Sequence, residues 1–453
     1  MTRLDAISLT DVRGFYKKQK IIFAKPNGKN GSGLTVIVGP NNSGKTTVIE
    51  GFKKIFQGSP PQFDIEERHR NRNVILAIKN TAGEIKTLKT NGGSIGIIDH
   101  PEYYPQVNNF YFISSRRYFE TYFDTSQLDH NQHRVNLINI SKSGIDSHFG
   151  RRMIAIDADQ QQKAKFNKII TVLIPNFVDW RIELSRGNNY IKYQTGKRDE
   201  HSSEFFGDGI TSLFKIASAL VEKNNDEILI IDEPELSLHP QAQKRFIKLL
   251  SEESADKQII ISTHSTYFVR WHDIENGAKI IRLNKPQDKQ CLVNNLTLNT
   301  IDNLLRLTQD YQKPQLLDTV SKEIFFAEKV LFVEGQIDMS LIINFCHTEN
   351  ISLGFELFGY GSGGAGNIFY FLTMAKELGV KAGAIFDNNS TKDFNKCHES
   401  YHDDFKIEKI WKDDIIDKTN SDGLFDKNGI IKGSEKNKFI NLINDFNNFF
   451  NTI

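Results

Sequence analysis

Two acidic residues follow one apolar strand near the middle of the sequence, in a pattern suited to nucleotide chemistry. The segment EILIIDEPELSLHP contains the apolar run Ile228–Ile231, which ends in Asp232 and Glu233. A buried strand of a parallel sheet presents its C-terminal acids at the edge where ligands bind. We expect Asp232 to hold Mg²⁺, often through water, and Glu233 to orient and polarise the attacking water. Alone, the pattern also fits an ordinary strand that ends in solvated acids.

A phosphate-binding loop lies far upstream, in LTVIVGPNNSGKTTVIEGFKKIF. Gly39, Gly44, Lys45 and Thr46 have the spacing GxxxxGK[ST], between a β-rich apolar run and a segment with helical periodicity. Backbone N–H groups of such a loop point at phosphates, the lysine bridges the outer phosphates, and the hydroxyl ligates Mg²⁺. The predicted nucleotide-binding residues here are Asn41, Asn42, Ser43, Gly44, Lys45, Thr46 and Thr47.

Two more segments extend the predicted ATP site. The strand Ile259–Ile261 leads into a polar turn with His264, which could reach the γ-phosphate beside Glu233. A helix predicted to run to about Val221 offers an anion site at its N-terminus. Because the phosphate-binding loop already covers one face of the nucleotide, we expect this helix to serve the ATP of a second subunit. A plain helix cap is the alternative. The residues assigned to this contact are Ser203, Gly207, Asp208 and Gly209.

A second group of acids follows strands in the C-terminal part of the chain. VLFVEGQIDMSLIINF begins as an apolar strand, turns at Gly335 and continues as a helix, with Glu334 and Asp338 on either side of the turn. Alternating strands and helices continue to Asp387, which predicts a parallel sheet with its acids at one edge. Mg²⁺ prefers carboxylate ligands and could there activate water and neutralise the leaving oxygen of a phosphodiester. A small flavodoxin-like sheet whose acids cap helices remains the alternative.

The composition bounds these functions. The 453 residues suffice for two or three domains, with 39% hydrophobic and 25% charged residues. No apolar run approaches the ~20 residues of a membrane helix, and the N-terminus lacks the apolar core of a secretory signal. Three scattered cysteines suit free thiols in a reducing cytoplasm, where we expect the protein. The net charge of +1 leaves open whether the local basic clusters are solvated faces or nucleic-acid contacts; the clusters contain Arg70, Arg116, Arg117, Arg151 and Arg152.

In chain order, the phosphate-binding loop, GDGI, IIDEPELSLHP and STH resemble the ABC-type ATPases of the SMC/RecF/OLD group. The opening ISLTDVRGFYKKQKIIF, with its turn at Arg13–Phe15, is similar to the first strands of that group. The resemblance implies an α/β P-loop NTPase domain over residues 1–315, with an inserted helical dimerisation lobe at about 119–179. It also implies a head-to-tail dimer that holds two ATP molecules. FFGDGI in place of LSGGQ disfavours a transporter subunit, and Arg116 or Arg117 stands where a Q-loop glutamine is usual.

Residues 316–453 resemble linker helices followed by a TOPRIM domain, the small Rossmann-like parallel-sheet domain fused to ABC-type ATPases in the OLD family. VEGQID matches that family's metal motif, which gives Glu334 and Asp338 ligand roles. In IFDNNS, Asp387 carries over as a ligand, whereas Asn389 departs from the usual acid and offers a weaker amide oxygen.

The resemblance implies two further residues at the TOPRIM site. An acid is expected after the next strand, where we favour Asp414 over Asp413. A lysine usually stabilises the charge that develops on the phosphoryl group. Lys436 is our choice for this role, and Lys432 and Lys438 are further candidates.

An ATP-binding and ATP-hydrolysing, metal-dependent DNA endonuclease of the OLD type is the function that the resemblance implies, as effector of a Gabija-, PARIS- or retron-associated antiphage system. The expected catalytic residues are Glu233, His264, Glu334, Asp387 and Lys436. Expected cofactors are ATP and Mg²⁺, with Mn²⁺ as a substitute at the TOPRIM site. Expected partners are further copies of the chain, DNA, and a defence protein such as a helicase or a reverse transcriptase with its RNA, with no membrane. The alternative is an ATP-dependent sensor or scaffold whose TOPRIM domain binds without cutting.

Overall fold

The computed structural model describes ten stretches of the chain, which fall into two units. One unit contains residues 1–38 and 42–293, and the other contains residues 39–41 and 294–453, so the units divide earlier than the predicted boundary at 315. Both are α/β, which confirms the predicted fold class. The described stretches are 3–56, 61–69, 72–99, 110–140, 144–185, 187–222, 227–286, 289–308, 319–419 and 421–452.

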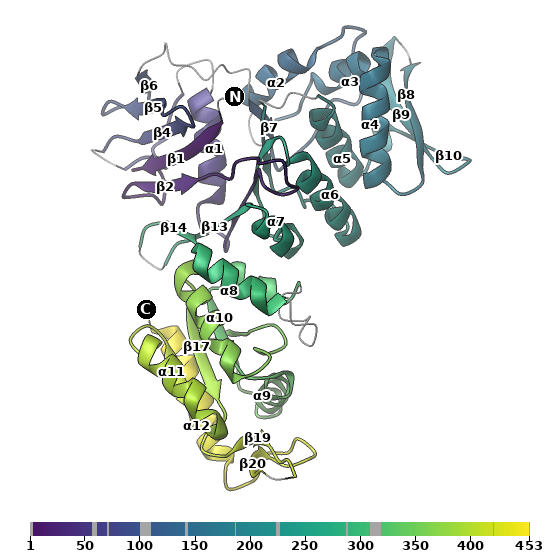
Figure 1. Ribbon diagram of the computed structural model, residues 1–453. Helices are drawn as coiled ribbons and strands as arrows, with labels where there is room; N and C mark the ends of the chain where they lie inside the picture. The colour runs from purple at the N-terminus through teal and green to yellow at the C-terminus, as the bar shows by residue number, and fades with distance from the viewer. Residues whose placement is uncertain are drawn as a thin grey trace. The chain divides into compact units, whose positions relative to one another are not determined.

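Two sheets build the body of the first unit (Figure 1). One is antiparallel, with strand order β2-β1-β4-β5-β6, and comprises β1 (Leu4–Thr10), β2 (Gln19–Ile22), β4 (Ile75–Asn80), β5 (Ile85–Thr90) and β6 (Gly96–Asp99). The other has the order β14-β13-β3-β12-β11-β7 and is parallel from β13 to β7. Its strands are β3 (Leu34–Val38), β7 (Phe110–Ile113), β11 (Ile228–Asp232), β12 (Gln258–Ser262), β13 (Lys279–Asn284) and β14 (Leu292–Asn295).

Helix α1 (Lys45–Phe56) packs against both sheets. Its apolar side chains at Val48, Ile49 and Phe52 share one buried core with Ile7 and Leu76 of the antiparallel sheet and with strands of the parallel sheet. Strands β3, β11 and β12 are buried along their whole length, as expected for central parallel strands covered on both faces. Because β3 and β11 both run parallel to β12, their C-terminal ends lie at the same edge of the sheet. This edge carries the predicted ATP site.

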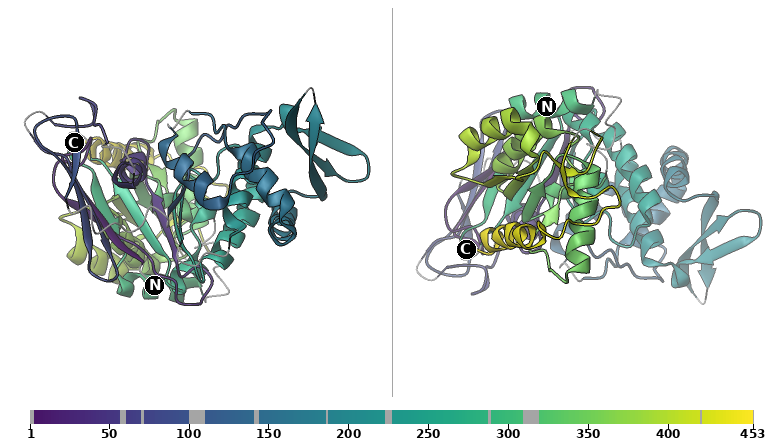
Figure 2. Two further views of the ribbon diagram at one scale, coloured as in Figure 1. Left: turned by 90° about the horizontal axis from the view of Figure 1, so that it is seen from above. Right: turned by 90° about the horizontal axis from the view of Figure 1, so that it is seen from below.

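An inserted lobe follows β7, with its helices within residues 119–179 and its strands mostly after them. It contains α2 (His130–Asn139), α3 (Phe149–Ala158) and α4 (Gln160–Leu173), followed by the antiparallel strands β8 (Phe177–Ser185), β9 (Asn188–Thr195) and β10 (Asp199–Ser202). The β8–β10 sheet projects from the end of the lobe in both views of Figure 2. The chain returns through the short helix η2 (Ser203–Phe205) into α5 (Asp208–Leu220).

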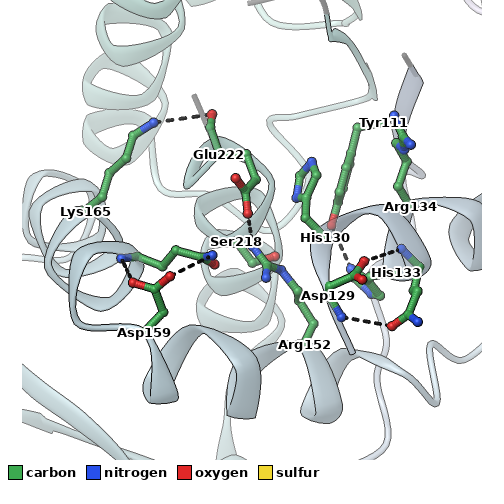
Figure 3. A network of polar contacts seen from close by, with 12 residues as sticks. Tyr111, Asp129, His130, His133, Arg134, Arg152, Asp159, Lys165, Ser218 and Glu222 are labelled. Atoms are coloured by element: carbon green, nitrogen blue, oxygen red, sulfur yellow. Dashed lines mark hydrogen bonds and ion pairs between the residues drawn. The ribbon is translucent and has the colours of Figure 1, made fainter. Parts of the chain in front are cut away.

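A buried polar network ties this lobe to the parallel sheet (Figure 3). The Tyr111 hydroxyl of β7 lies 2.8 Å from Nδ1 of His133, whose Nε2 lies 3.0 Å from the Asp146 carboxylate. The Lys215 ammonium of α5 pairs with the same carboxylate at 2.9 Å. Strand β7, helix α2 and helix α5 are thereby held by one buried carboxylate.

Helices α6 (Pro240–Glu253) and α7 (Trp271–Glu275) and the short helix η3 (Thr266–Phe268) complete the first unit. The second unit begins with α8 (Leu298–Thr308) and the short helix η5 (Ser321–Phe325). Much of the predicted linker-helix segment, residues 309–318, lies outside the described stretches.

The second unit is a four-stranded parallel sheet of order β16-β15-β17-β18 between helices. The predicted alternation of strands and helices up to Asp387 is present as β15 (Lys329–Phe332), α9 (Gln336–Thr348), β16 (Glu356–Leu357), α10 (Ala365–Leu378) and β17 (Lys381–Phe386). Helix α11 (Thr391–Tyr401), which the sequence pattern does not predict, then leads to β18 (Lys406–Lys409). The remaining elements are η6 (Asn388–Ser390), β19 (Asp414–Ile416), β20 (Gly423–Phe425) and α12 (Lys436–Asn451).

Alternation along β15 assigns the two faces of this sheet. Leu331 and Val333 pack with α9 and α12 in one core. Phe332 faces the other way, where its ring lies 6.0 Å from that of Phe371 on α10. Helices thus cover both faces of the sheet. Glu334 and Asp387 follow the C-terminal ends of β15 and β17, and this end of the sheet is called the rim.

Candidate nucleotide and metal sites

The phosphate-binding loop is shaped by a contact with the Arg13–Phe15 turn. Gly44 has a left-handed φ of +102°, and a Cβ at this position would lie 2.9 Å from the Phe15 ring. Arg13 fixes the turn by ion pairs with Glu50 of α1 at 2.6 Å and Glu67 at 2.9 Å. The Arg13–Phe15 turn therefore packs directly against the phosphate-binding loop. A side chain at position 44 would clash with the Phe15 ring, so only glycine fits there.

Lys45 lies buried at the start of α1, with its Nζ 3.4 Å from the Ser43 hydroxyl. Burial lowers the pKa of Lys45 to about 8, although the negative charges of Glu233, Glu235 and Asp232 oppose the shift. An ammonium that has lost much of its water beside these acids is suited to bind phosphate oxygens. The other predicted loop residues are in place, with Asn41 and Asn42 exposed and Thr46 half-buried at the first turn of α1.

The two acids after β11 are held in a tight turn. Asp232 is buried and accepts a hydrogen bond from the Ser262 hydroxyl at the end of β12. Glu233 has a left-handed φ of +47°, and its N–H donates to the Ser262 carbonyl at 2.9 Å. A non-glycine residue in this region costs of order 1 kcal/mol or more. Strain of this kind is often found where a turn must aim a functional side chain.

The turn that carries His264 is held by Glu235, an acid that was not predicted from the sequence. Glu235 accepts hydrogen bonds from the Thr263 hydroxyl at 2.8 Å and from the His264 N–H at 2.5 Å. The His264 side chain is exposed, and desolvation together with the Lys45 charge lowers its pKa. A neutral imidazole near Lys45 is therefore favoured, and its ring N–H can donate a hydrogen bond to a phosphate oxygen.

The helix start predicted to meet a second nucleotide is Gly207, the N-cap of α5. A Cβ on Gly209 would lie 2.5 Å from the Ser237 carbonyl, so the first turn of α5 packs closely on the segment after β11. Ser203 lies outside this helix, in η2. Its buried hydroxyl accepts from the Ile191 N–H and donates to the Thr121 carbonyl. Ser203 is thus placed to support the lobe, not to reach a nucleotide.

The two arginines after β7 have different environments. Arg116 is exposed, whereas Arg117 is buried and donates hydrogen bonds to the backbone of Asp232 and Glu233. Both arginines line a cavity of about 190 Å³ together with the first turn of α5 and Ser237. The guanidinium of Arg117, at the position of the usual Q-loop glutamine, therefore makes its hydrogen bonds inside the subunit.

Four acids gather at the rim of the second unit, three of them almost fully buried: Glu334, Asp338, Asp387 and Asp414. Burial, followed by the charges of Asp338, Glu334 and Asp414, raises the pKa of Asp387 to about 8. Burial and the charges of Glu334 and Asp414 likewise raise the pKa of Asp338 to about 6, against a hydrogen bond from Gly335. The charge of each acid thus contributes to the raised pKa values of its neighbours, so the four carboxyl groups lie within electrostatic range of one another.

The glycine-rich segment GYGSGGAGN holds the acidic turn in place. The Gly364 N–H donates to the Glu334 carbonyl at 2.7 Å, and the Ser362 N–H donates to the Val333 carbonyl at 2.9 Å. Gly361 has φ +83°, and a Cβ there would lie 2.4 Å from the carbonyl carbon of Gly335. The backbone of the glycine segment thus contacts the acidic turn directly, and a side chain at position 361 would separate them.

The donor set fits a divalent cation in its chemistry, because oxygen-rich, mutually repelling carboxylates are what Mg²⁺ and Mn²⁺ bind. In the described part of the chain, however, no three His, Cys, Asp or Glu side chains stand in a metal-binding arrangement. One Glu334 oxygen accepts from the Asp387 N–H at 2.8 Å, and one Asp338 oxygen accepts from the Gly335 N–H at 2.7 Å. Binding of a cation would therefore require small side-chain rotations from these positions.

A lysine that sequence reasoning missed lies at this rim. The Lys418 ammonium pairs with the Asp414 carboxylate, and its charge also acts on Asp338 and Asp387. Of the four acids, Asp414 is the one that has this counter-charge at contact distance. The four-residue spacing from Asp414 does not predict the contact, because side chains at that spacing are neighbours in a helix and Asp414 lies in strand β19.

The expected lysine, Lys436, pairs with Glu349 at 2.8 Å. Glu349 follows the C-terminal end of α9, whereas Asp338 lies in the first turn, about 16 Å away along the helix. The role expected for Lys436 therefore lacks geometric support, because its contact is at the opposite end of α9.

The remaining candidate residues for this site make contacts of other kinds. Lys432 pairs with Asp417 and Asp422, and Lys438 lies 3.9 Å from the centre of the Trp411 ring. Asn389 is exposed in η6, and Asp413 is exposed and contributes its carbonyl to the Asn389 N–H. Of the two adjacent acids, the structure thus brings Asp414 to the cluster.

The described arginines of the basic cluster at positions 151 and 152 make local ion pairs. Arg151 pairs with Asp124 at 2.6 Å, and the buried Arg152 pairs with Glu222 at 3.3 Å (Figure 3). Arg70 lies outside the described residues.

The three cysteines are buried free thiols. Within the described stretches, no helix has both the length and the apolar character to cross a bilayer.

Two protein-family models match the chain, one in each unit. Residues 80–270 match the family described as "AAA domain, putative AbiEii toxin, Type IV TA system". Residues 325–388 match the TOPRIM domain of proteins similar to the overcoming lysogenization defect protein, abbreviated OLD. The second match contains Glu334, Asp338 and Asp387.

Curated relatives include an OLD nuclease from Thermus scotoductus, 28% identical over 184 residues, or 40% of this chain. Endonuclease GajA from Bacillus cereus is 26% identical over 239 residues, or 46% of this chain. Each match spans 34% of the relative's own length, so the chain covers about a third of these proteins.

Solved structures with a similar course of the chain include two SMC head domains. One is the SMC head bound to the C-terminal winged-helix domain of ScpA, with 17% identity and a TM-score of 0.40, which covers 66% of this chain and 99% of that chain. The other is the SMC head domain from Thermotoga maritima, with 19% identity and a TM-score of 0.37, which covers 65% of this chain and 100% of that chain.

Proposed function

We propose that this chain, which joins an ATPase domain to an OLD-like TOPRIM domain, is an ATP-controlled, metal-dependent DNA endonuclease. The observation that carries the proposal is the group of four acids at the rim of the second sheet, three of them buried, whose charges raise one another's pKa values. Carboxylates withdrawn from water in this way are stabilised by a bound cation. The names of the two relatives, a nuclease and an endonuclease, support the same reaction class.

In the ATPase domain, the loop from Asn41 to Thr47 would hold the phosphates, with Lys45 on the outer ones. Thr46 and Asp232 would hold Mg²⁺, which would neutralise phosphate charge. Glu233 would orient the attacking water and His264 would contact the γ-phosphate. The start of α5 at Gly207, Asp208 and Gly209 would face the nucleotide of a second copy, which makes a homodimer the proposed working form.

In the TOPRIM domain, Glu334, Asp338, Asp387 and Asp414 would hold Mg²⁺ or Mn²⁺, with Asn389 as a weaker contributor. The bound cation would supply Lewis-acid activation of water and charge neutralisation at the leaving oxygen of a phosphodiester. The raised pKa of Asp387 would suit it to take a proton when no cation is bound. Lys418 is better placed than Lys436 to contact a phosphate that approaches the rim.

A role as effector in antiphage defence rests on the OLD-type domain pair and on the similarity to GajA. DNA is the proposed substrate, and a defence protein from a Gabija-, PARIS- or retron-associated system is the proposed partner. Because the chain covers about a third of each relative, these roles need direct tests on this protein.

The direct test is cleavage of supercoiled plasmid by the purified chain with Mg²⁺ or Mn²⁺, with and without ATP. Glu334→Gln should slow cleavage at least ~10²-fold, because it removes one charged ligand from the cation site. Glu399→Gln, an exposed acid on α11, is the matched control and should cleave at the wild-type rate. Equal cleavage by Glu334→Gln and wild type would refute the assignment of the rim.

A second candidate is the sensor or scaffold that binds without cutting. The position of Lys418 on Asp414, the departure at Asn389 and the lack of a preformed metal arrangement among the described side chains favour it. For a sensor or scaffold, Lys45→Ala abolishes function in a phage-challenge assay while Glu334→Gln retains it. Loss in both variants favours the nuclease.

A further inference from the structure

Arg117 connects three elements of the ATPase domain through one buried guanidinium. Its Nη1 donates to the Ser212 hydroxyl of α5 at 3.0 Å. Its Nη2 donates to the Asp232 carbonyl at 2.8 Å and to the Glu233 carbonyl at 2.9 Å. Arg117 is 4% exposed and Ser212 is also buried, so water cannot readily replace these bonds.

The contact falls on a residue with a left-handed backbone conformation. Glu233 has φ +47°, a conformation that persists only where surrounding groups hold it. The two carbonyls that Arg117 binds belong to the peptides on either side of the Glu233 side chain. Fixing these peptides fixes the direction of the Cα–Cβ bond, and therefore where the Glu233 carboxylate points.

The same guanidinium also contacts helix α5, so its position depends on where this helix lies. Ser212 lies one turn after Asp208, on the helix whose start the proposed function assigns to the nucleotide of a second copy. A shift of α5 would move Ser212 relative to Arg117 and disturb the bonds to the Glu233 turn. An arginine fork can bind three acceptors at once, whereas a lysine offers one point charge.

We propose that Arg117 is a positioning residue that couples helix α5 to the Glu233 turn, so that docking on α5 sets the aim of the hydrolytic carboxylate. This inference rests on the proposed ATPase function. Arg117 acts through the backbone and touches neither the nucleotide nor the attacking water. It therefore affects the rate of hydrolysis more than the affinity for ATP.

The test compares Arg117→Met, Arg117→Lys and Ser212→Ala in the full chain, with fluorescent ATP-analogue binding and ATP turnover as readouts. Arg117→Met should lower kcat roughly 10²-fold, because a misplacement of about 1 Å costs that much. The Kd should stay within about threefold, since Lys45 and its loop are intact. Arg117→Lys should recover part of the rate, and Ser212→Ala, which removes one bond of three, should cost about threefold.

The matched control is Arg152, another buried arginine of the same unit, which pairs with Glu222 away from the turn. Arg152→Met measures the general cost of deleting a buried arginine and should leave kcat per folded molecule unchanged. Thermal unfolding of each variant gives the folded fraction.

Three results would decide against the coupling. Wild-type kcat in Arg117→Met, or equal losses of kcat in Arg117→Met and Arg152→Met, overturns the inference and leaves the ATPase function standing. Parallel loss of affinity and rate in Arg117→Met also overturns it, because Arg117 would then belong to nucleotide binding. A wild-type chain that neither binds nor hydrolyses ATP instead refutes the proposed function itself.

Discussion

Glu233 emerges from a strained turn directly after a buried strand, beside the buried ammonium of Lys45. Glu233→Gln keeps the shape of the side chain and removes its ability to polarise water. ATP binding should persist while hydrolysis falls roughly 10²- to 10⁴-fold. Single-turnover hydrolysis and analogue binding measure the two effects separately. Glu252→Gln, an exposed acid on α6, is the control. Normal hydrolysis by Glu233→Gln would remove Glu233 from the catalytic role.

The role of a single residue could be predicted from the sequence where it depends on residues nearby in the chain, and not where it depends on distant ones. Asp232 ends β11, Glu334 comes soon after β15, and Lys45 begins α1 after the phosphate-binding loop. Their place at a sheet edge can therefore be read from neighbouring residues. Arg117 could not be assigned in this way, because its partners lie 95 to 116 positions away. Lys436 is suggested only by its place near the chain end, whereas its contact with Glu349 depends on how α12 packs against α9.

At the scale of elements, the glycine segment after β16 determines where the acidic turn lies. Gly361→Ala places a Cβ 2.4 Å from Gly335 at φ +83°, so it should cost about 1–3 kcal/mol of stability and weaken Mn²⁺ binding. Gly366→Ala is the matched control, because Gly366 lies inside α10 with its nearest neighbouring atom 3.7 Å away. This variant should be about 0.5–1 kcal/mol more stable. Urea unfolding and Mn²⁺ titration check both, and unchanged Mn²⁺ binding in Gly361→Ala would contradict the account.

The lobe depends on the buried carboxylate of Asp146. Burial alone would raise the pKa of Asp146, but the Lys215 ammonium and His133 bring it well below its usual range. A carboxyl whose pKa is lower in the folded state stabilises the fold above its unfolded pKa of about 4 and loses this effect as pH falls. Asp146→Asn should therefore cost about 3–5 kcal/mol at neutral pH, because it leaves Lys215 buried without its partner.

Denaturant unfolding of Asp146→Asn and wild type at neutral pH and below about pH 4 checks the sign, and the difference should narrow at the lower pH. Asp124→Asn removes an exposed ion pair and should unfold at nearly the same denaturant concentration as wild type at both pH values. A difference between Asp146→Asn and wild type that grows on acidification would contradict the account.

Element order was largely predictable, because strand and helix periodicity alternate regularly after Lys329. The helical insert was also predictable from its polar, helix-like composition. The place of Ser203 was not, since η2 and α5 are separated only by Phe206 and Gly207, and which side of that break faces a ligand depends on packing against β9.

At the scale of the whole molecule, one chain carries two candidate sites on two parallel sheets. Each sheet delivers acids from the C-terminal ends of its strands, as expected for open α/β folds. The ATPase resemblance and the TOPRIM resemblance are both confirmed by the family matches. We propose that the two sites are linked in function, because nucleotide-driven pairing of chains would control cutting at the second site.

The central claim is that the rim of the second sheet holds a divalent cation. The measurement that tests it most directly is titration of the nucleotide-free chain with Mn²⁺, followed by electron paramagnetic resonance, for wild type, Asp387→Asn and the control Glu399→Gln. We expect wild type and Glu399→Gln to bind Mn²⁺ equally and Asp387→Asn to bind more than about 100-fold more weakly, because the most repelled carboxylate is neutralised. Equal Mn²⁺ binding in all three proteins, or none in wild type, would contradict the account.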